Sequence, residues 1–371
     1  AVSSDAICVF CPARSATVAS ASNVASNVAS NAGPRSVSPS NRYRSANRPP
    51  AAGWTTPTIA LDRHINTITV YGTNLAGVVG RASIVIDRAV PDNTTNYVAA
   101  TGAHTWPFLS WSTAATNLND AVREAGLSNV VVVADGTNFC DTSLTIERPL
   151  TLQSVNGADA TFVYATPRLE GSLVRMNAGV LDGFTLGTLG TATAVNGGGI
   201  LLDGTGSVRN CTVLGFGAEA YGGGIYCRYG QVSNCVVRGC RAVYGGGVFI
   251  ELAGLLEDTT CDDNAAAGGG GAYLVYDGLV RNCIFTANRA QSANAAGVRL
   301  PANAALHAGE NRGGGLFMNN GGSATACLFE RNVADYGAGA YIVSDGELEG
   351  STVRANVATY YAAVYLQYGG G

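Results

Sequence analysis

The strongest constraint in this sequence is a glycine that recurs at a fixed interval through its C-terminal half. The repeat units begin at Gly206, Gly230, Gly254, Gly278, Gly322, Gly346 and Gly370. Successive units start 24 residues apart, except that 44 residues separate Gly278 from Gly322. A fixed period of this length predicts a solenoid in which each unit forms one coil. Short β-preferring runs between glycine turns, without helical periodicity, favour a parallel β-helix over a helical repeat.

Residues at equal distances from the repeat glycine form columns of similar chemistry. Small thiol or hydroxyl residues stand five positions after it: Cys211, Cys235, Thr259, Cys283, Cys327 and Ser351. Alanine stands twelve positions after it: Ala218, Ala242, Ala266, Ala290, Ala334 and Ala358. In the later units asparagine stands ten positions after it: Asn264, Asn288, Asn332 and Asn356. An aromatic residue comes shortly before the next glycine: Tyr226, Phe249, Tyr273, Phe317, Tyr341 and Tyr365.

In a parallel β-helix each column becomes a stack along the axis, with neighbours about 4.8 Å apart. We expect the aromatic stack to fill one corner of the coil and the alanines to permit a tight turn at another. The asparagine amides are expected to be buried and to hydrogen-bond to the coils above and below. The cysteines are expected to act as small buried hydrophobes. Because parallel side chains on neighbouring strands point the wrong way for a disulfide dihedral, we predict reduced thiols.

The first 128 residues differ in character from the repeats. Residues 1–57 are rich in Ala, Ser, Asn, Val and Pro and are predicted to be a low-complexity linker. The linker contains Cys8 and Cys11, which lack a second cysteine pair or a nearby histidine and are interpreted as a tail without metal or redox chemistry. Two alternating runs in 58–90 predict a β-hairpin, with Ile68, Val70, Ala82, Ile84 and Ile86 on its apolar face.

Residues 91–128 are predicted to be an N-terminal cap, followed by the β-helix over 129–371. A helix is expected over 110–126, started by Ser112 or Thr113 and ended by Gly126. Its apolar stripe is Ala115, Leu118, Ala121, Val122 and Ala125, and three aromatic residues are expected beneath it: Trp106, Phe108 and Trp111. A helix laid over the first strand would protect the open end of the sheet.

Several segments carry resemblances to known families. The 58–90 hairpin resembles the last two strands of an immunoglobulin-like module. Residues 97–126, with "LTIERPLTLQSVNG" (144–157), "LDGFTL" (181–186) and the "GGGIY…NC" repeats, resemble secreted bacterial right-handed parallel β-helix proteins of the pectin-lyase-like superfamily. The glycine triplet with isoleucine at 222–225 and the Phe-x-x-Asn segments at 285–288 and 329–332 are similar to repeats of polymorphic outer-membrane adhesins. The resemblance implies an all-β, right-handed parallel β-helix with an N-terminal capping helix, secreted or held at a bacterial cell surface.

The same resemblance implies enzymes that cleave acidic polysaccharides. Its lyases hold Ca²⁺ with carboxylates and use Arg or Lys as base, and its hydrolases use two or three converging Asp. This chain has no lysine. Its charged columns alternate in sign between neighbouring coils, as at Arg238 and Asp262, which is typical of solvent-facing ladders. The least regular region, 157–205, supplies the remaining carboxylate candidates: Asp159, Glu170, Asp182 and Asp203.

One long unit contains an excess of 20 residues, roughly 291–310. Long loops on rigid scaffolds are places where binding residues accumulate. Four charged or titratable residues in or beside this insertion are the candidate ligand-binding site: Arg299, His307, Glu310 and Arg312. We expect a glycan or a surface protein as the ligand, against the simpler interpretation of a solvated loop.

The favoured function is a non-catalytic secreted or cell-surface β-helix that acts in adhesion or as a scaffold. A polysaccharide lyase or glycoside hydrolase is the alternative, and only a lyase would require Ca²⁺; otherwise no cofactor is expected. The net charge of −4 argues against nucleic acid as a partner, and the lack of a long apolar run argues against direct membrane insertion. The chain ends where a new unit would begin, which predicts a fragment of a longer protein or end-to-end self-association as a stalk or filament through 369–371.

Overall fold

The structure, a computed structural model, describes residues 92, 94–190, 194–291 and 311–367, together with the backbone of four strands that precede them. The chain divides into two compact units, Ala1–Pro91 and Asp92–Gly371. In the first unit β1 (Ser15–Ala16) pairs antiparallel with β2 (Ile59–Ala60), and β3 (His64–Thr73) pairs antiparallel with β4 (Val79–Arg88). Ile68 lies opposite Ile84 and Val70 opposite Ala82, so the two runs in 58–90 pair as a hairpin would. The immunoglobulin-like resemblance stays a prediction.

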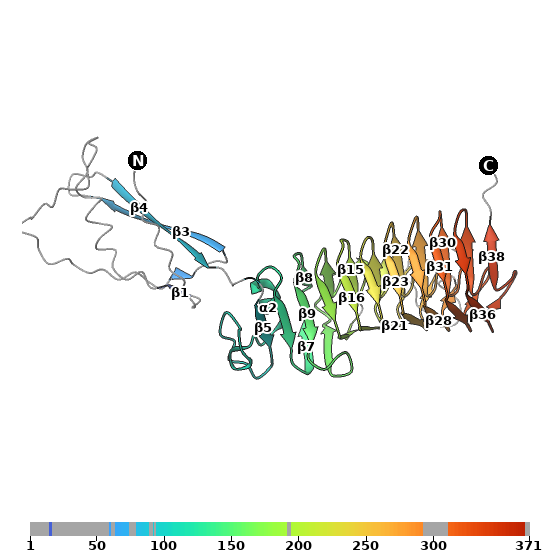
Figure 1. Ribbon diagram of the computed structural model, residues 1–371, viewed down its shortest axis with the longest axis horizontal. Coiled ribbons are helices and arrows are strands. Elements are labelled where there is room, and N and C mark those ends of the chain that lie inside the picture. The colour runs from blue at the N-terminus through green and yellow to red at the C-terminus, as the bar shows by residue number, and fades with distance from the viewer. Residues whose placement is uncertain are drawn as a thin grey trace, which may run out of the picture. The chain divides into compact units, whose positions relative to one another are not determined.

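The second unit is an all-β parallel solenoid with three long sheets (Figure 1). Sheet 1 contains β5 (Thr95–Val98), β6 (Val130–Val133), β9 (Thr151–Ser154), β12 (Val180–Asp182), β16 (Ser207–Arg209), β20 (Gln231–Ser233), β23 (Leu255–Glu257), β27 (Leu279–Arg281), β31 (Ser323–Thr325) and β35 (Glu347–Glu349). Sheet 2 contains β7 (Gly136–Cys140), β10 (Thr161–Ala165), β13 (Thr185–Thr188), β17 (Thr212–Leu214), β21 (Val236–Arg238), β24 (Thr260–Asp262), β28 (Ile284–Thr286), β32 (Leu328–Glu330) and β36 (Thr352–Arg354). Sheet 3 contains β8 (Leu144–Ile146), β11 (Val174–Met176), β15 (Ile200–Leu202), β19 (Ile225–Cys227), β22 (Val248–Glu251), β26 (Ala272–Val275), β30 (Leu316–Asn319), β34 (Ala340–Val343) and β38 (Val364–Gln367).

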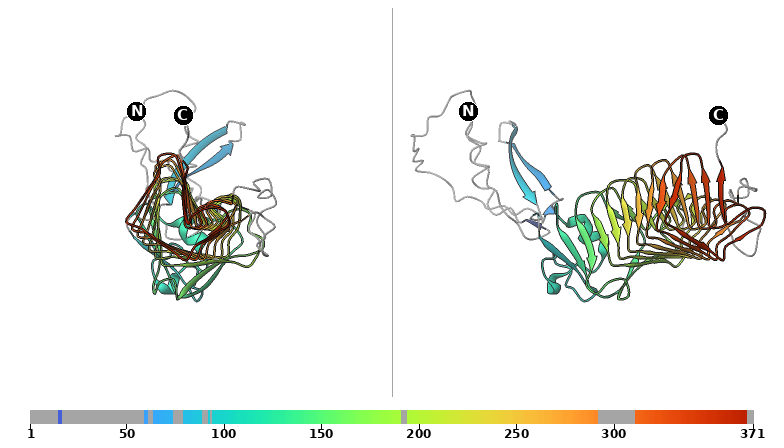
Figure 2. Two further views of the ribbon diagram at one scale, coloured as in Figure 1. Left: turned by 90° about the vertical axis from the view of Figure 1, so that its right-hand side faces the viewer. Right: turned by 45° about the vertical axis from the view of Figure 1, so that its right-hand side comes forward.

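From the coil of β13 onward the described coils have a further segment between sheet 2 and sheet 3, which we call the arm. It carries two short parallel sheets, one of β14 (Ala194–Asn196) and β18 (Ala218–Tyr221) and one of β25 (Ala265–Ala266), β29 (Arg289–Ala290), β33 (Val333–Ala334) and β37 (Val357–Ala358). The alanine column runs through the arm, where Ala266 pairs with Ala290 and Ala334 with Ala358. Seen along the axis, successive coils lie on top of one another (Figure 2, left). The predicted all-β solenoid is therefore confirmed.

Two corners of the coil are turned by single residues in the left-handed region, which explains the residue types beside them. In the corner between sheets 1 and 2, Asn282 has φ 53° and Asn234 has φ 49°. The next residue folds back over this bend: the Cys283 thiol donates to the carbonyl of Arg281 at 3.1 Å, and the Thr259 hydroxyl donates to that of Glu257 at 2.8 Å. Cysteine, threonine and serine share this column because each places a small donor two residues after a carbonyl.

The asparagine column forms a buried hydrogen-bonded ladder at the next corner. The Asn288 side-chain oxygen accepts from the backbone N–H and the amide of Asn264, both at 3.0 Å. Its amide nitrogen donates to Cys261 O at 2.8 Å and to the Asn332 side-chain oxygen at 3.0 Å. Asn264, Asn288 and Asn332 have no exposed surface, so these bonds satisfy polar groups that water cannot reach.

The eight described cysteines are free, buried thiols. Burial raises the pKa of Cys227 and of Cys240 to about 12, against an ordinary value of 9.0. Since the folded state holds these protons more tightly, their contribution to stability is complete below pH 9.0 and is lost as the pH rises towards about 12. We expect urea unfolding to show a falling free energy above about pH 9, by up to roughly 1.4 kcal/mol per pH unit for each thiol. Cys240→Ala should reduce that slope, and an unchanged slope would contradict this.

The N-terminal end differs from the prediction of one helix over 110–126. The structure has a 3-10 helix η1 (Trp111–Thr113), capped by Ser110, and a separate helix α2 (Leu118–Glu124), capped by Asn117. The two are separate because the Ala115 N–H donates to Tyr97 O at 2.9 Å, and Ala115 forms a bridge to Val98 of β5. Ser112 and Thr113 therefore do not start the helix predicted over 110–126, and α2 ends at Glu124, before Gly126.

The apolar stripe of the predicted helix is buried, as are Trp106 and Phe108, but Trp111 was placed wrongly. Trp111 is 45% exposed, and its ring lies edge to face with that of Tyr97, at 4.6 Å between ring centroids. Helix α2 contacts β5, β6 and β8 at the N-terminal end of the solenoid (Figure 1). Sheet 1 begins with β5, inside the segment predicted to be only a cap.

Candidate functional site: an aromatic groove on sheet 3

The aromatic column, expected to fill one corner of the coil, is a buried cluster on the outward face of sheet 3. Ile225 and Cys227 point into the core and are fully buried, so Tyr226 between them points outward. Parallel pairing puts Tyr226, Phe249 and Tyr273 side by side on successive coils. Their ring centroids are 5.5 Å and 5.3 Å apart, and the planes differ by 2° and 11°. The ladder continues through three further rings: Phe317, Tyr341 and Tyr365.

A second column on the arm covers this ladder. The column, which we call the wall, consists of Tyr221, Tyr244, Gly268, Arg312 and Tyr336. Side chains of the wall contact ladder rings one coil further on. The ring centroids of Tyr221 and Phe249 are 4.6 Å apart, and those of Tyr244 and Tyr273 are 5.2 Å apart. The guanidinium carbon of Arg312 lies 5.2 Å from the ring centroid of Tyr341. At Gly268 the missing side chain leaves room for the ring of Phe317. The wall therefore buries the ladder, although the ladder lies on the outward face of sheet 3.

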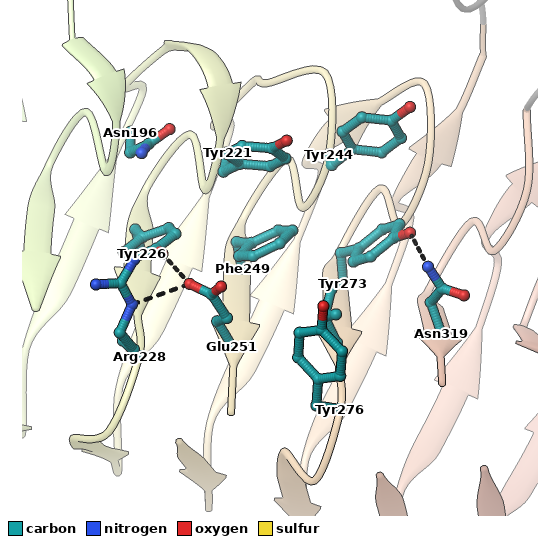
Figure 3. Close-up of a pocket in the computed structure, with 11 residues that line it drawn as sticks. Asn196, Tyr221, Tyr226, Arg228, Tyr244, Phe249, Glu251, Tyr273, Tyr276 and Asn319 are labelled. Atoms are coloured by element: carbon teal, nitrogen blue, oxygen red, sulfur yellow. Dashed lines mark hydrogen bonds and ion pairs between the residues drawn. The ribbon is translucent and has the colours of Figure 1, made fainter. Parts of the chain in front are cut away.

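Part of the space between the wall and sheet 3 stays open as a groove of about 460 Å³. Figure 3 shows Tyr226, Phe249 and Tyr273 in one row, with Tyr221 above them and Tyr276 below. The ladder rings are nearly covered, but Tyr221 is 37% and Tyr276 46% exposed. The groove therefore has a closed aromatic floor and two accessible tyrosines at its rims.

A charged network lies along the same face of sheet 3. Arg228 is held between two carboxylates, with Nη1 at 2.7 Å from Asp203 and Nε at 3.0 Å from Glu251. The third nitrogen, Nη2, donates to the Tyr226 hydroxyl at 3.0 Å, and that hydroxyl donates to Glu251. The bond to Glu251 helps to raise the pKa of Arg228, while burial and the same carboxylate raise the pKa of Tyr226. Arg228 stays charged and Tyr226 stays protonated.

Of the predicted ligand-binding residues, the structure places only Arg312. Arg299, His307 and Glu310 lie outside the described residues. The described residues stop at Gln291 and resume at Asn311, and Arg312 keeps its bridges to Gly268 and Tyr336. The coils on either side of the insertion therefore stay in register. Whether the insertion binds a ligand stays a prediction.

The carboxylates proposed for an enzyme do not converge. Only Asp203 belongs to the network beside the groove. Asp182 is on sheet 1 and pairs with Arg209 at 2.8 Å, while Asp159 and Glu170 are exposed in turns. The alternating charge ladders are present, with Arg238 at 3.1 Å from Asp262 and Arg281 at 3.8 Å from Glu257. Within the described ranges, no group of three or more His, Cys, Asp or Glu is placed to hold a metal ion.

A comparison with protein families extends these observations. Residues 191–369 match the family model described as right handed beta helix region. The parallel solenoid over these residues is a right-handed β-helix. No curated protein and no solved structure matches it. Among the described residues of this β-helix protein, no helix has the length and apolar character needed to cross a membrane. Bacterial origin, secretion and likeness to adhesins stay predictions.

The functional residues missed in the sequence have a recognisable signal in the β-helix repeats. Tyr221, Tyr244 and Tyr336 each come directly before a glycine-rich turn, in "YGGG", "YGGG" and "YGAG". That position marks the wall. Arg228 and Glu251 gave no such signal, because the residue type at this position changes from one coil to the next.

Proposed function

We propose that this β-helix protein is a non-catalytic adhesion or scaffold protein of an outer surface, and that it binds a glycan in the groove of sheet 3. The observation that carries the proposal is the pair of exposed tyrosines, Tyr221 and Tyr276, at the rims of an aromatic groove. The secreted or cell-surface location depends on the resemblance of the repeats to secreted bacterial proteins.

The chemistry of the groove suits a sugar chain. A pyranose ring has apolar C–H faces and polar hydroxyl edges, and tyrosine combines a flat apolar ring with a hydroxyl. Asn196, Glu251 and Asn319 line the groove beside the rings and can orient hydroxyls. A groove of about 460 Å³ belongs to the size class of small-ligand sites, whereas a stable protein interface needs a much broader contact surface. A glycan is therefore favoured over a surface protein.

A polysaccharide lyase or glycoside hydrolase is the competing function. Glycoside hydrolysis needs one carboxyl group that donates a proton and another that activates water or attacks the sugar. Glu251 is the carboxylate among the described residues that line the groove, Asp203 lies beside it, and both are bound to the single guanidinium of Arg228. This arrangement supports an ion-pair network that shapes the groove, and it favours binding without turnover.

Binding by the rim tyrosines can be tested on the intact chain. We expect the chain to bind oligosaccharides on a glycan array, and we expect Tyr276→Ala to weaken binding of the strongest hit by roughly tenfold. Tyr276 makes no ring stack among the described residues, so its removal should leave the fold intact. Calorimetric titration would measure the affinity, and circular dichroism would check the fold.

Phe139→Ala is the matched control, because Phe139 is 61% exposed on sheet 2, away from the groove. It should bind the sugar as the unchanged chain does. An affinity lost equally in both variants, or in neither, would reject the groove as the site. Release of reducing ends or unsaturated products from the bound glycan would instead favour the enzyme.

A further inference from the structure

We infer that the groove selects uncharged glycans and discriminates against glycans that carry carboxylates. This inference depends on the proposed function, because it names the class of sugar that the same groove accepts. The charges on sheet 3 carry it.

The groove has no unpaired cation among the described residues that line it. Arg228 is the only basic residue among the described residues that line it. Its three nitrogens are each engaged, with Asp203 at 2.7 Å, Glu251 at 3.0 Å and the Tyr226 hydroxyl at 3.0 Å. The guanidinium has five N–H groups, so a sugar carboxylate could still reach the remaining two, but it would share the single positive charge of Arg228 with Asp203 and Glu251.

The charged groups around Arg228 are negative in sum. Arg228 is paired with two carboxylates, so the three groups together carry one net negative charge. An acidic sugar that entered beside them would meet charge of its own sign, which acts as a repulsive element of specificity. Asp203 is 44% exposed, so solvent and salt weaken its part of this repulsion, whereas Glu251 is only 26% exposed.

The groove offers hydrogen-bond acceptors to a neutral sugar. Glu251 uses Oε2 for both Arg228 and Tyr226, which leaves Oε1 able to accept another hydrogen bond. The Asn319 amide nitrogen donates to the Tyr273 hydroxyl at 3.1 Å, which leaves the Asn319 side-chain oxygen as a second acceptor in the groove. These are acceptors, and sugar hydroxyls are donors that carry no charge. A polyhydroxylated neutral chain satisfies them without disturbing Arg228.

Arg312 is the residue that could reverse this preference. It lies on the wall two coils beyond Tyr244, its guanidinium is over the Tyr341 ring, and its Nε is buried without a hydrogen-bond partner in the described part of the chain. It does not line the groove. A long acidic chain that reached Arg312 would show a salt-dependent affinity that Arg312→Gln removes.

The experiment compares matched pairs of oligosaccharides with the intact chain. Each pair is a neutral gluco-, manno- or galacto-oligosaccharide and the same backbone oxidised at C6 to the uronate. We expect the neutral member of the best pair to bind at least roughly tenfold more tightly, with little dependence on salt. Glu251→Gln should improve binding of the uronate member several-fold, because it removes a negative charge from the groove and loosens the hold on Arg228.

The outcomes separate the inference from the proposed function. Equal binding within every pair, or tighter binding of the uronate member, would overturn the selectivity while leaving the groove as a glycan site. Loss of that uronate binding in Arg312→Gln would show that Arg312 supplies the missing cation. Binding to no member of any pair or array would overturn the proposed function itself.

Discussion

Gly270→Ala is expected to destabilise the solenoid by about 4 kcal/mol, among the largest effects of a single substitution. A Cβ atom at Gly270 would lie 2.5 Å from the carbonyl oxygen of Arg289 and 2.5 Å from that of Gly314. Both are backbone atoms and cannot rotate away. The Gly314 oxygen also accepts from the Gly271 N–H at 3.0 Å, so moving it would break a bond between coils. Urea unfolding followed by circular dichroism would measure the loss.

Gly217→Ala is the control for this prediction. Apart from the residues before and after it in the sequence, the atom nearest to a Cβ added at Gly217 is the carbonyl oxygen of Arg241, at 3.8 Å. The φ of Gly217 is not in the left-handed region. We expect this variant to unfold within about 0.5 kcal/mol of the unchanged chain. If the two variants unfolded at the same urea concentration, the close approach of neighbouring coils at the glycine-rich turn would be wrong.

Asn288→Ala is expected to cost about 3 kcal/mol, the second large effect. The side chain makes four hydrogen bonds, and its loss leaves the Asn264 N–H and the Cys261 carbonyl without these partners in the buried interior. An unsatisfied buried donor or acceptor costs about 1–3 kcal/mol, and more than one is created here. Thermal or urea unfolding would measure it.

Asn282→Ala is the matched control for the ladder. Asn282 is exposed at a left-handed bend, and the equivalent position of the next coil is Ala326, with φ 55°. Alanine is thus accommodated at this bend, and we expect a cost below about 1 kcal/mol. A larger loss from Asn282→Ala than from Asn288→Ala would show that the bends, and not the asparagine ladder, hold successive coils together.

The stacking of the coils could be predicted from the sequence because the period converts directly into contacts. Asn264, Asn288 and Asn332 stand ten positions after their repeat glycines, and the structure joins them through their side chains. The insertion did not obscure this, since the 44-residue unit returns to register at Arg312. Fixed periods specify which residues are neighbours.

The side on which a column lies could not be predicted from the period. Side chains alternate along a strand, so a shift of one residue changes a column from the interior to the surface. The aromatic column is assigned to the surface by its buried neighbours Ile225 and Cys227, and both kinds of position carry apolar residues here. Because the arm covers the outward face of sheet 3, that face carries the apolar residues that are typical of a core.

The charged network escaped prediction for a related reason. Asp203, Arg228 and Glu251 are neighbours on successive coils, but 25 and 23 residues separate them rather than 24. The segment between sheets 2 and 3 shortens by two residues and then by one over these coils, so columns counted from the repeat glycine separate these three side chains. The long helix was overestimated because Ala115 is used by a strand, a tertiary contact that overrides a helical pattern.

Hydroxyl-radical footprinting of the intact chain, with and without its tightest-binding neutral oligosaccharide, tests most directly whether sugars occupy the groove. The account predicts that the sugar protects Tyr221 and Tyr276 from oxidation, while Phe139 on sheet 2 reacts equally in both samples. Protection confined to Phe139 or to other surfaces, with both rim tyrosines unchanged, would contradict it.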